Sequence, residues 1–285
     1  MASAPVTTTS AAPSPRPRRR PHAAYAVGER VLTFVDSARQ RRLVTIVRYP
    51  KAPGRFPLIV FGHGFAVTPA PYSALLGSWA RAGYVVAAPV FPFGNANAPG
   101  GPNEQDLVNQ PRDMSFVITG MLADSATRSG VLAGAIDPGK VAVSGQSDGG
   151  DTALAVAYDP RYGDARIGAA VILSGAEIPF LAKIHFASPS PPLLATQGTA
   201  DTINPPSATS MFFDAAPPPK YLVRLIGAPH LPPYTDMQPQ LGIVERTSLA
   251  FLDYYLKGRR GALRRMAAAA TVSRTATLTA DPPIR

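Results

Sequence analysis

Apolar residues along the chain follow two different spacings, and the change from one to the other divides it into predicted strands and helices. Short runs in which nearly every residue is apolar are typical of strands buried on both faces of a parallel sheet. Between these runs, apolar residues recur with the spacing of an amphipathic helix. The apolar runs lie at residues 57–61, 84–90, 141–144, 169–173, 193–196 and 221–226. The helical stretches lie at residues 71–83, 114–123, 151–158, 207–215 and 241–256.

Strands that alternate with helices predict an α/β fold with a mainly parallel central sheet flanked by helices. Residues 31–36 and 42–49 are further β-type runs joined by a short turn, so we expect an antiparallel hairpin at a sheet edge. The segment 175–191 between two strands is of moderate length, and we expect no large lid. Ligands of open α/β sheets bind beyond the carboxyl ends of the strands. The loops at those ends are therefore the place to search for functional residues.

Composition and charge indicate one large domain over residues 25–257. The chain has 285 residues and is 46% hydrophobic, which suffices for a substantial core. Its net charge of +10 comes from the two ends: residues 1–22 carry four arginines and no acid, and residues 257–285 carry seven basic residues and one acid. We interpret residues 1–24 as a disordered basic segment and residues 258–285 as a basic Ala- and Thr-rich tail. A solubilising role of these ends is favoured over binding to anionic surfaces, and no nucleic-acid partner is expected.

What the chain lacks excludes several classes of protein. It contains no cysteine, which rules out disulfides and thiolate metal sites. Its four histidines lack the paired spacing of zinc ligands, and no phosphate-binding G-x-x-x-x-G-K-S/T motif occurs, so we expect no metal site and no phosphate-cradling loop. No apolar run approaches the roughly 18 residues of a transmembrane segment. The first residues do not form a recognisable secretory signal, so the localisation is left open: cytoplasmic for the chain as written, or secreted if the true start lies upstream.

The residues Gly145-Gln146-Ser147-Asp148-Gly149 match the G-x-S-x-G pattern of a nucleophile elbow. A strand-like run enters the motif and an Ala-rich helical run leaves it, which is the context that the motif requires. The turn is so tight that its flanking positions must be small, and the two glycines meet this need. We therefore predict that Ser147 is a nucleophile exposed above the sheet edge. The alternative is a glycine-rich turn in which Ser147 only caps the following helix.

Two further strand ends carry residues that would activate Ser147. Asp201 follows the strand at 193–196, and His230 follows the strand at 221–226. A serine hydroxyl is a weak nucleophile and needs a base, and a histidine can serve because its ordinary pKa is near neutrality. A carboxylate then holds the imidazole in the required tautomer. The chain order Ser, Asp, His is the order found in α/β-hydrolases.

Other residues compete for the roles of acid and base. His22 lies in the N-terminal segment, His63 lies in a turn after an early strand, and His185 lies in a segment that either lines the cleft or faces solvent. For His63 we favour a role in holding the shape of its turn. Asp159 and Asp164 lie in a loop after a helix, where capping or turn formation is the favoured interpretation.

The tetrahedral intermediate that forms when such a serine attacks a carbonyl group needs two donors directed at its oxyanion. We predict the backbone N–H of Asp148, which follows the nucleophile, and that of Phe65, in the turn after an early strand. The side chain of Asp148 is expected to point away from the site. Phe65, Ile178 and Phe180 are candidate apolar walls for substrate binding, with ordinary loop packing as the alternative. The Pro-, Gly- and Asn-rich loop 91–110 is a further candidate wall.

Five short segments together carry a resemblance to a known superfamily. They are residues 62–65 (Gly-His-Gly-Phe), 82–89 (Ala-Gly-Tyr-Val-Val-Ala-Ala-Pro), 145–150 (Gly-Gln-Ser-Asp-Gly-Gly), 198–201 (Gly-Thr-Ala-Asp) and 227–230 (Gly-Ala-Pro-His). With them, residues 57–256 resemble the α/β-hydrolase superfamily, and within it the dienelactone-hydrolase-like, platelet-activating-factor-acetylhydrolase-like, chlorophyllase-like and polyester-hydrolase-like branch. Gln146 departs from the His that commonly precedes the nucleophile in this branch, which leaves the subfamily open but not the triad.

The resemblance implies a serine hydrolase that cleaves carboxylic esters through an acyl-enzyme, without a cofactor. Its substrate would be a small-molecule, lipid or polymer ester, and the oligomeric state is left open. The alternatives are a non-catalytic binding protein of the same fold and a hydrolase specific for a lactone, a polyester or a lipid. A binding protein would have no need of a nucleophile, an acid, a base and an oxyanion turn together, which favours the enzyme.

Overall fold

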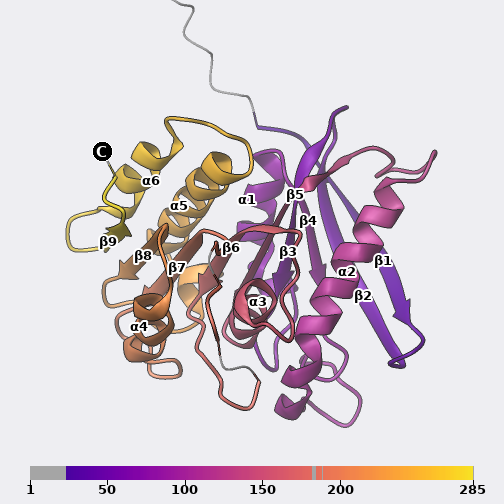
Figure 1. Ribbon diagram of the computed structural model, residues 1–285, viewed down its shortest axis with the longest axis horizontal. Helices are drawn as coiled ribbons and strands as arrows, with labels where there is room; N and C mark the ends of the chain where they lie inside the picture. The colour runs from indigo at the N-terminus through magenta and orange to yellow at the C-terminus, as the bar shows by residue number, and fades with distance from the viewer. Residues whose placement is uncertain (1–23, 182–183, 188, 285) are drawn as a thin grey trace, which may run out of the picture.

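The computed structural model describes residues 24–181, 184–187 and 189–284, and a nine-stranded sheet runs through this part of the chain (Figure 1). The central strands are parallel, and the antiparallel strands lie at the two edges. The predicted α/β fold is confirmed, whereas the segment 1–24 falls outside the described residues except for its last one. From edge to edge the strands are β1 (Val27–Asp36), β2 (Arg41–Pro50), β4 (Val85–Pro89), β3 (Phe56–Gly62), β5 (Ile136–Gln146), β6 (Ile167–Leu173), β7 (Leu193–Gly198), β8 (Lys220–Leu225) and β9 (Ala276–Asp281).

Helices connect the strands and cover both faces of the sheet (Figure 1). Two of them have proline at the first or second helical position, where its missing N–H costs no hydrogen bond. Within the described residues, none is both long enough and apolar enough to pass through a membrane. The helices are α1 (Ser73–Arg81), α2 (Gln110–Ser125), α3 (Asp148–Tyr158), α4 (Pro206–Ala215), α5 (Gln240–Tyr255) and α6 (Ala262–Ala270), with the 3-10 helices η1 (Ala70–Tyr72), η2 (Glu104–Asn109) and η3 (Pro232–Tyr234).

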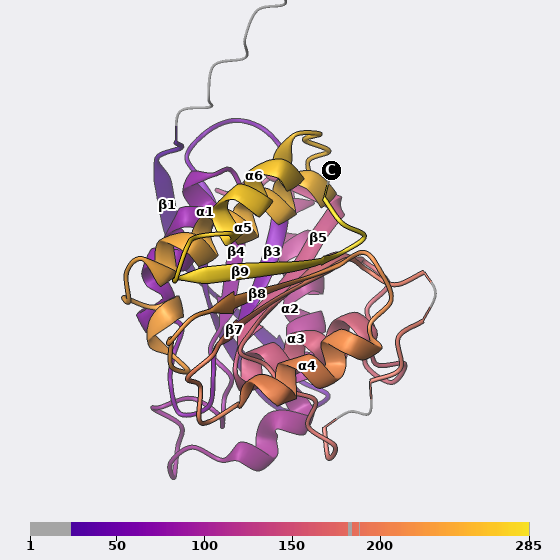
Figure 2. The same ribbon diagram turned by 90° about the vertical axis from the view of Figure 1, so that its left-hand side faces the viewer.

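Helices lie on the two faces of the sheet (Figure 2). Two hydrophobic clusters, one on each face, hold these layers together. Side chains alternate along a strand. Ile59 and Phe61 of β3 therefore pack with α1, α5 and α6, while Leu58 and Val60 pack with α2, α3 and α4. All four side chains are fully buried. Burial on both faces explains why the central strands are apolar at almost every position.

The segment 258–285, which the sequence sets apart as a tail, is instead part of the domain up to residue 284. β9 pairs antiparallel with β8 along its whole length and forms one edge of the sheet. α6 packs against α5 and buries Met266 and Ala270 in the core. Both elements depend on a neighbour. The short helix α6 gains its stability from packing on α5, and the edge strand β9 gains its stability from pairing with β8.

A buried ion cluster ties the long loop 91–109 to the sheet. Arg41, at the start of β2, is 5% exposed. Its guanidinium donates to both oxygens of Asp106 in η2, at 2.7 and 2.8 Å, and to Asp113 in α2. A buried charge without its partner is costly. The cluster therefore holds the loop in one position at the carboxyl end of β4, beside the edge of the sheet where the functional residues lie.

Candidate active site

Ser147 occupies the sharp turn between β5 and α3. Its backbone angles, φ 54° and ψ −127°, lie in a region that few non-glycine residues adopt. A Cβ at Gly145 would overlap the carbonyl group of Gly149, and a Cβ at Gly149 would overlap that of Gly62. The side chain of Ser147 makes no capping hydrogen bond to α3, which argues against the helix-cap alternative. The strand, the strained turn and the helix together form the geometry of a nucleophile elbow.

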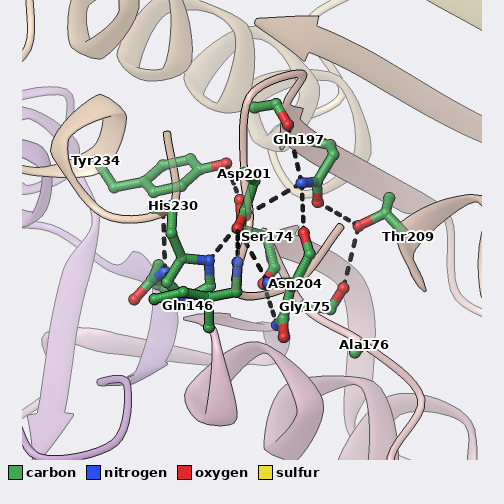
Figure 3. Close-up of polar contacts among 12 residues, drawn as sticks. Gln146, Ser174, Gly175, Ala176, Gln197, Asp201, Asn204, Thr209, His230 and Tyr234 are labelled. Atoms are coloured by element: carbon green, nitrogen blue, oxygen red, sulfur yellow. Dashed lines mark hydrogen bonds and ion pairs between the residues drawn. The ribbon is translucent and has the colours of Figure 1, made fainter. Parts of the chain in front are cut away.

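His230, in the loop after β8, faces Asp201, in the loop after β7 (Figure 3). Nδ1 of His230 lies 2.7 Å from Oδ2 of Asp201. A carboxylate oxygen only accepts hydrogen bonds, so in the neutral imidazole Nδ1 carries the proton and Nε2 keeps its lone pair. The two residues are 29 positions apart, but β7 and β8 are parallel neighbours, so their carboxyl ends lie side by side.

Asp201 is held by hydrogen bonds on both of its oxygens (Figure 3). Oδ1 accepts from the backbone N–H groups of Ile203 and Asn204, each at 3.0 Å, and Oδ2 accepts from Nε2 of Gln197 at 3.1 Å. Burial alone would raise the pKa of Asp201. The hydrogen bond to His230, the charge of that residue and the two backbone N–H groups outweigh burial and lower the pKa below its ordinary value. The carboxylate is therefore ionised and aligned with the imidazole.

Gln197, on β7, orders the loop that carries the acid. Besides Asp201, its side-chain amide donates to the carbonyl oxygen of Asn204 at 2.9 Å and accepts from the hydroxyl of Thr209 at 2.6 Å. The amide is 1% exposed, so it has exchanged water for these partners. Sequence reasoning missed Gln197, although a polar residue within an apolar run at a strand end was a signal that could have found it.

Tyr234, in η3, anchors the loop that carries His230 (Figure 3). Its hydroxyl lies 2.8 Å from the hydroxyl of Ser174 and donates to the carbonyl oxygen of Thr196 at 3.1 Å. The side chain is fully buried, and burial raises its pKa to about 12. The tyrosine therefore joins the histidine loop to the ends of β6 and β7. No pattern in the sequence pointed to it.

Ser147 and His230 line the same pocket, which has a volume of about 350 Å³. Most of its wall is apolar, which suits the acyl or alcohol part of an ester. The lining residues are Gly64, Phe65, Val67, Gln146, Ser147, Thr202, Ile203, Pro229, His230, Leu231 and Pro232.

Of the three residues predicted as apolar walls, the structure brings only Phe65 to this pocket. Ile178 packs instead on a small cluster around Leu107 and Leu181. Phe180 is 58% exposed and is not among the residues that line the pocket. The segment between β6 and β7 carries both residues to a separate part of the surface, and its course was not encoded in any local pattern.

The turn after β3 holds Phe65 with its backbone N–H available. The neighbouring N–H of Gly64 donates to the hydroxyl of Tyr72 at 3.3 Å, and that of Ala66 donates to the carbonyl oxygen of Gly94 at 2.9 Å. Within the described residues, the N–H of Phe65 makes no such bond. Of these three successive N–H groups, it is the one without a hydrogen-bond partner in the described part of the chain.

His63 stabilises this turn from inside. Its Nδ1 donates to the carbonyl oxygen of Gly64 at 2.8 Å, and its Nε2 accepts from the backbone N–H of Phe91 at 3.0 Å. Burial lowers the pKa of His63 to about 4, so the ring stays neutral. Both nitrogens are used, which leaves none for a base. His185 is exposed and lines pockets other than that of Ser147, and His22 lies outside the described residues.

Asp148 contributes a buried carboxyl group beside the nucleophile. The residue is 8% exposed, and its Oδ2 has no hydrogen-bond partner in the described part of the chain. Burial raises the pKa of Asp148 to about 6, and the negative charge of Glu104 acts in the same direction. The carboxyl also interacts with the backbone N–H of its own residue and with the charge of His230. Burial thus makes this carboxyl easier to protonate than an exposed aspartate.

The fold, the elbow and the pair of His230 and Asp201 define a protein of the α/β-hydrolase type. A model of the chlorophyllase family matches residues 29–173, about half of the chain, and the chain belongs to this family. The matched span includes Ser147, whereas Asp201 and His230 lie beyond it. No curated protein matches the chain. Membership of the family indicates a hydrolase of the carboxylesterase type.

No group of three His, Asp or Glu side chains among the described residues has the geometry of a metal site.

Proposed function

We propose that this protein hydrolyses carboxylic esters through an acyl-enzyme, with Ser147 as nucleophile, His230 as base and Asp201 as the partner of the base. One observation carries the proposal. The contact of His230 with Asp201 at 2.7 Å makes Nε2 the acceptor nitrogen of a ring that lines the same pocket as Ser147. The chlorophyllase family supports an ester as the substrate class. Attack, proton transfer and charge stabilisation are all supplied by groups of the chain, so the reaction requires no cofactor.

In the acylation step, Oγ of Ser147 attacks the carbonyl carbon of the ester while Nε2 of His230 takes the hydroxyl proton. Asp201 stabilises the imidazolium that forms. The carbonyl oxygen becomes negative and accepts hydrogen bonds from the backbone N–H groups of Phe65 and Asp148. When the bond to the leaving oxygen breaks, His230 returns the proton to it, and the alcohol departs from the acyl-enzyme.

In the deacylation step, water takes the place of the alcohol. His230 removes a proton from the water as it attacks the acyl carbon, and the same two N–H groups bind the oxyanion. The bond to Oγ of Ser147 then breaks, His230 returns the proton to that oxygen, and the carboxylic acid leaves. Phe65 and Ile203 are placed to contact the acyl chain or the alcohol, because both line the pocket.

The test is hydrolysis of p-nitrophenyl esters of graded acyl length, beside a solid polyester and a phospholipid, with wild-type protein and Ser147→Ala. Wild type is expected to turn over at least one of these esters, and Ser147→Ala should lose at least three orders of magnitude in kcat. Activity retained in Ser147→Ala would overturn the assignment of the nucleophile.

A fluorophosphonate probe separates an enzyme from a non-catalytic binding protein of the same fold. The probe forms a stable adduct only with an activated serine. Folded wild-type protein should be labelled at Ser147, and Ser147→Ala should not be labelled. If folded wild-type protein takes up no label and hydrolyses none of the esters, the catalytic proposal fails.

A further inference from the structure

Gln146, directly before the nucleophile, lies between the turn that carries Phe65 and the loop that carries His230. Figure 3 shows Gln146 beside His230. Its side chain is almost fully buried. We propose that Gln146 is a positioning residue that joins the oxyanion turn to the catalytic histidine and holds the lone pair of His230 until the nucleophile replaces it. This inference rests on the proposed function, since it concerns the same reaction.

The hydrogen bonds through Gln146 form a chain with one direction. The N–H of Gly64 donates to the hydroxyl of Tyr72 at 3.3 Å, and this hydroxyl donates to Oε1 of Gln146 at 2.7 Å. Nε2 of Gln146 donates to the carbonyl oxygen and to Nε2 of His230, each at 3.2 Å. A backbone N–H can only donate and a carbonyl oxygen can only accept. The N–H of Gly64 and the carbonyl oxygen of His230, at the two ends of this series of hydrogen bonds, therefore determine the orientation of the Tyr72 hydroxyl and the Gln146 amide between them.

Tyr72 makes this chain rigid. Its ring is fully buried and packs against Phe61 with ring centroids 4.9 Å apart. Burial raises the pKa of Tyr72 well above its ordinary value, so its hydroxyl remains a donor at any working pH. Gly64 also lies close to the amide, because a Cβ there would be 2.9 Å from Oε1 of Gln146. The turn that carries Phe65 and the amide of Gln146 are therefore close to each other as well as linked by hydrogen bonds through Tyr72.

The amide meets His230 at the nitrogen that the reaction uses. Within the described residues, the hydroxyl of Ser147 makes no hydrogen bond to Nε2, and the N–H of Gln146 occupies that lone pair instead. For attack, the hydroxyl of Ser147 must replace the amide. Once Nε2 carries the proton, it and the amide are both donors and cannot bond to each other. Gln146 thus favours the neutral base before attack and turns the protonated base toward the leaving oxygen afterwards.

The most direct test is Gln146→Glu. Glutamate keeps the shape and the acceptor for Tyr72, but it offers His230 an acceptor in place of a donor. The carboxylates that face His230 from other elements, Asp201 after β7 and Asp148 on α3, are unchanged. We expect kcat to fall on the order of 10- to 100-fold with KM within about threefold of wild type. The acid limb of the pH profile of kcat/KM should move to higher pH, because a carboxylate favours the imidazolium.

A second pair of variants tests the series of hydrogen bonds as a whole rather than Gln146 alone. Tyr72→Phe removes one link without touching His230 and should lower kcat in the same direction. Gln146→Met/Tyr72→Phe should be no worse than Gln146→Met alone, because both changes break one chain. Tyr221→Phe is the matched control, since the residue is only 2% exposed and its hydroxyl bonds to Tyr255 at 2.9 Å, away from the site. It should keep the kcat of wild type, and thermal unfolding confirms that each variant is folded.

The outcomes separate this inference from the proposed function. If wild type shows no hydrolysis that depends on Ser147, the proposed function fails. If wild type is active but folded Gln146→Glu and Tyr72→Phe both keep its kcat and its acid limb, the function stands and the role of Gln146 is overturned. Additive losses in the double variant would likewise contradict a single chain.

Discussion

The N–H at Nδ1 of His230 donates to Oδ2 of Asp201 across 2.7 Å. An asparagine at position 201 has the same size but can present an N–H to Nδ1, which moves the proton of the neutral ring to Nε2. The lone pair that would take the proton of Ser147 is then lost. We expect Asp201→Asn to lower kcat by about three to four orders of magnitude with little change in KM, as measured by steady-state hydrolysis of a p-nitrophenyl ester.

Asp159→Asn is the matched control for this change. Asp159 is also buried in a loop, after α3, but its carboxylate bonds to Arg161 away from the pocket. The control should keep the kcat of wild type. Wild-type activity in Asp201→Asn would show that another group orients the imidazole.

A second prediction concerns the ion cluster around Arg41. Its removal leaves the buried carboxylates of Asp106 and Asp113 without their main partner. Arg41→Met should therefore lower the free energy of unfolding by about 3–5 kcal/mol, measured by urea denaturation. Arg39→Met is the comparison, because Arg39 also contacts Asp113 but is partly exposed, and it should cost about 1 kcal/mol or less. A loss in Arg41→Met no larger than that of the comparison would contradict the role of the cluster.

A third prediction uses the buried carboxyl of Asp148. Its pKa is raised to about 6 in the folded protein, by burial first and by Glu104 second. The folded state therefore binds a proton more tightly than the unfolded chain does, and this group makes the protein less stable as pH rises from about 4 to about 6. Asp148→Asn removes the effect. The variant should gain up to about 3 kcal/mol over wild type at pH 7–8 and little at pH 4.

The measurement is urea unfolding of both proteins between pH 4 and pH 8. Glu104→Gln is the control, since it removes only the second cause and should give a smaller gain over the same pH range. A difference between Asp148→Asn and wild type that does not depend on pH would show that the carboxyl is not destabilised by burial.

A fourth prediction concerns the pocket wall. Ile203 is 68% exposed, yet it lines the pocket with Ser147 and His230, so a substrate chain would cover it. Ile203→Ser should raise KM by about three- to tenfold for long acyl chains and little for acetate esters, because each buried methylene contributes about 0.8 kcal/mol. Met211→Ser, at a comparably exposed apolar residue on α4, is the control. Equal effects on short and long esters would place the acyl chain elsewhere.

Most of the fold was predictable because its signals are local. The apolar run 57–61 fills β3, and the helical spacing of 241–256 matches α5. The alanine-rich α6 and the strand β9 were left unassigned, because such short elements are marginal alone and gain their stability from α5 and β8.

The candidate site was predictable to the extent that it follows strand ends. Ser147, Asp201 and His230 each come after a strand, and parallel strands bring such residues to one edge of the sheet. The apolar wall was not predictable in the same way. Ile203 lines the pocket, whereas the predicted Ile178 and Phe180 do not. The conformation of these loops depends on contacts between residues far apart in the chain, which no local pattern records.

The sequence by itself determined the alternation of strands and helices, the strained turn at Ser147 and the order of the three polar residues, because these depend on neighbours along the chain. Only the tertiary structure decided what meets His230. In the sequence, Gln146 was only a departure from the residue common in its branch, but in the fold its amide contacts one nitrogen of the imidazole while Asp201 contacts the other. Hydrogen bonds between residues far apart in the chain have no local pattern, since the packing of the strands alone sets their distances and directions.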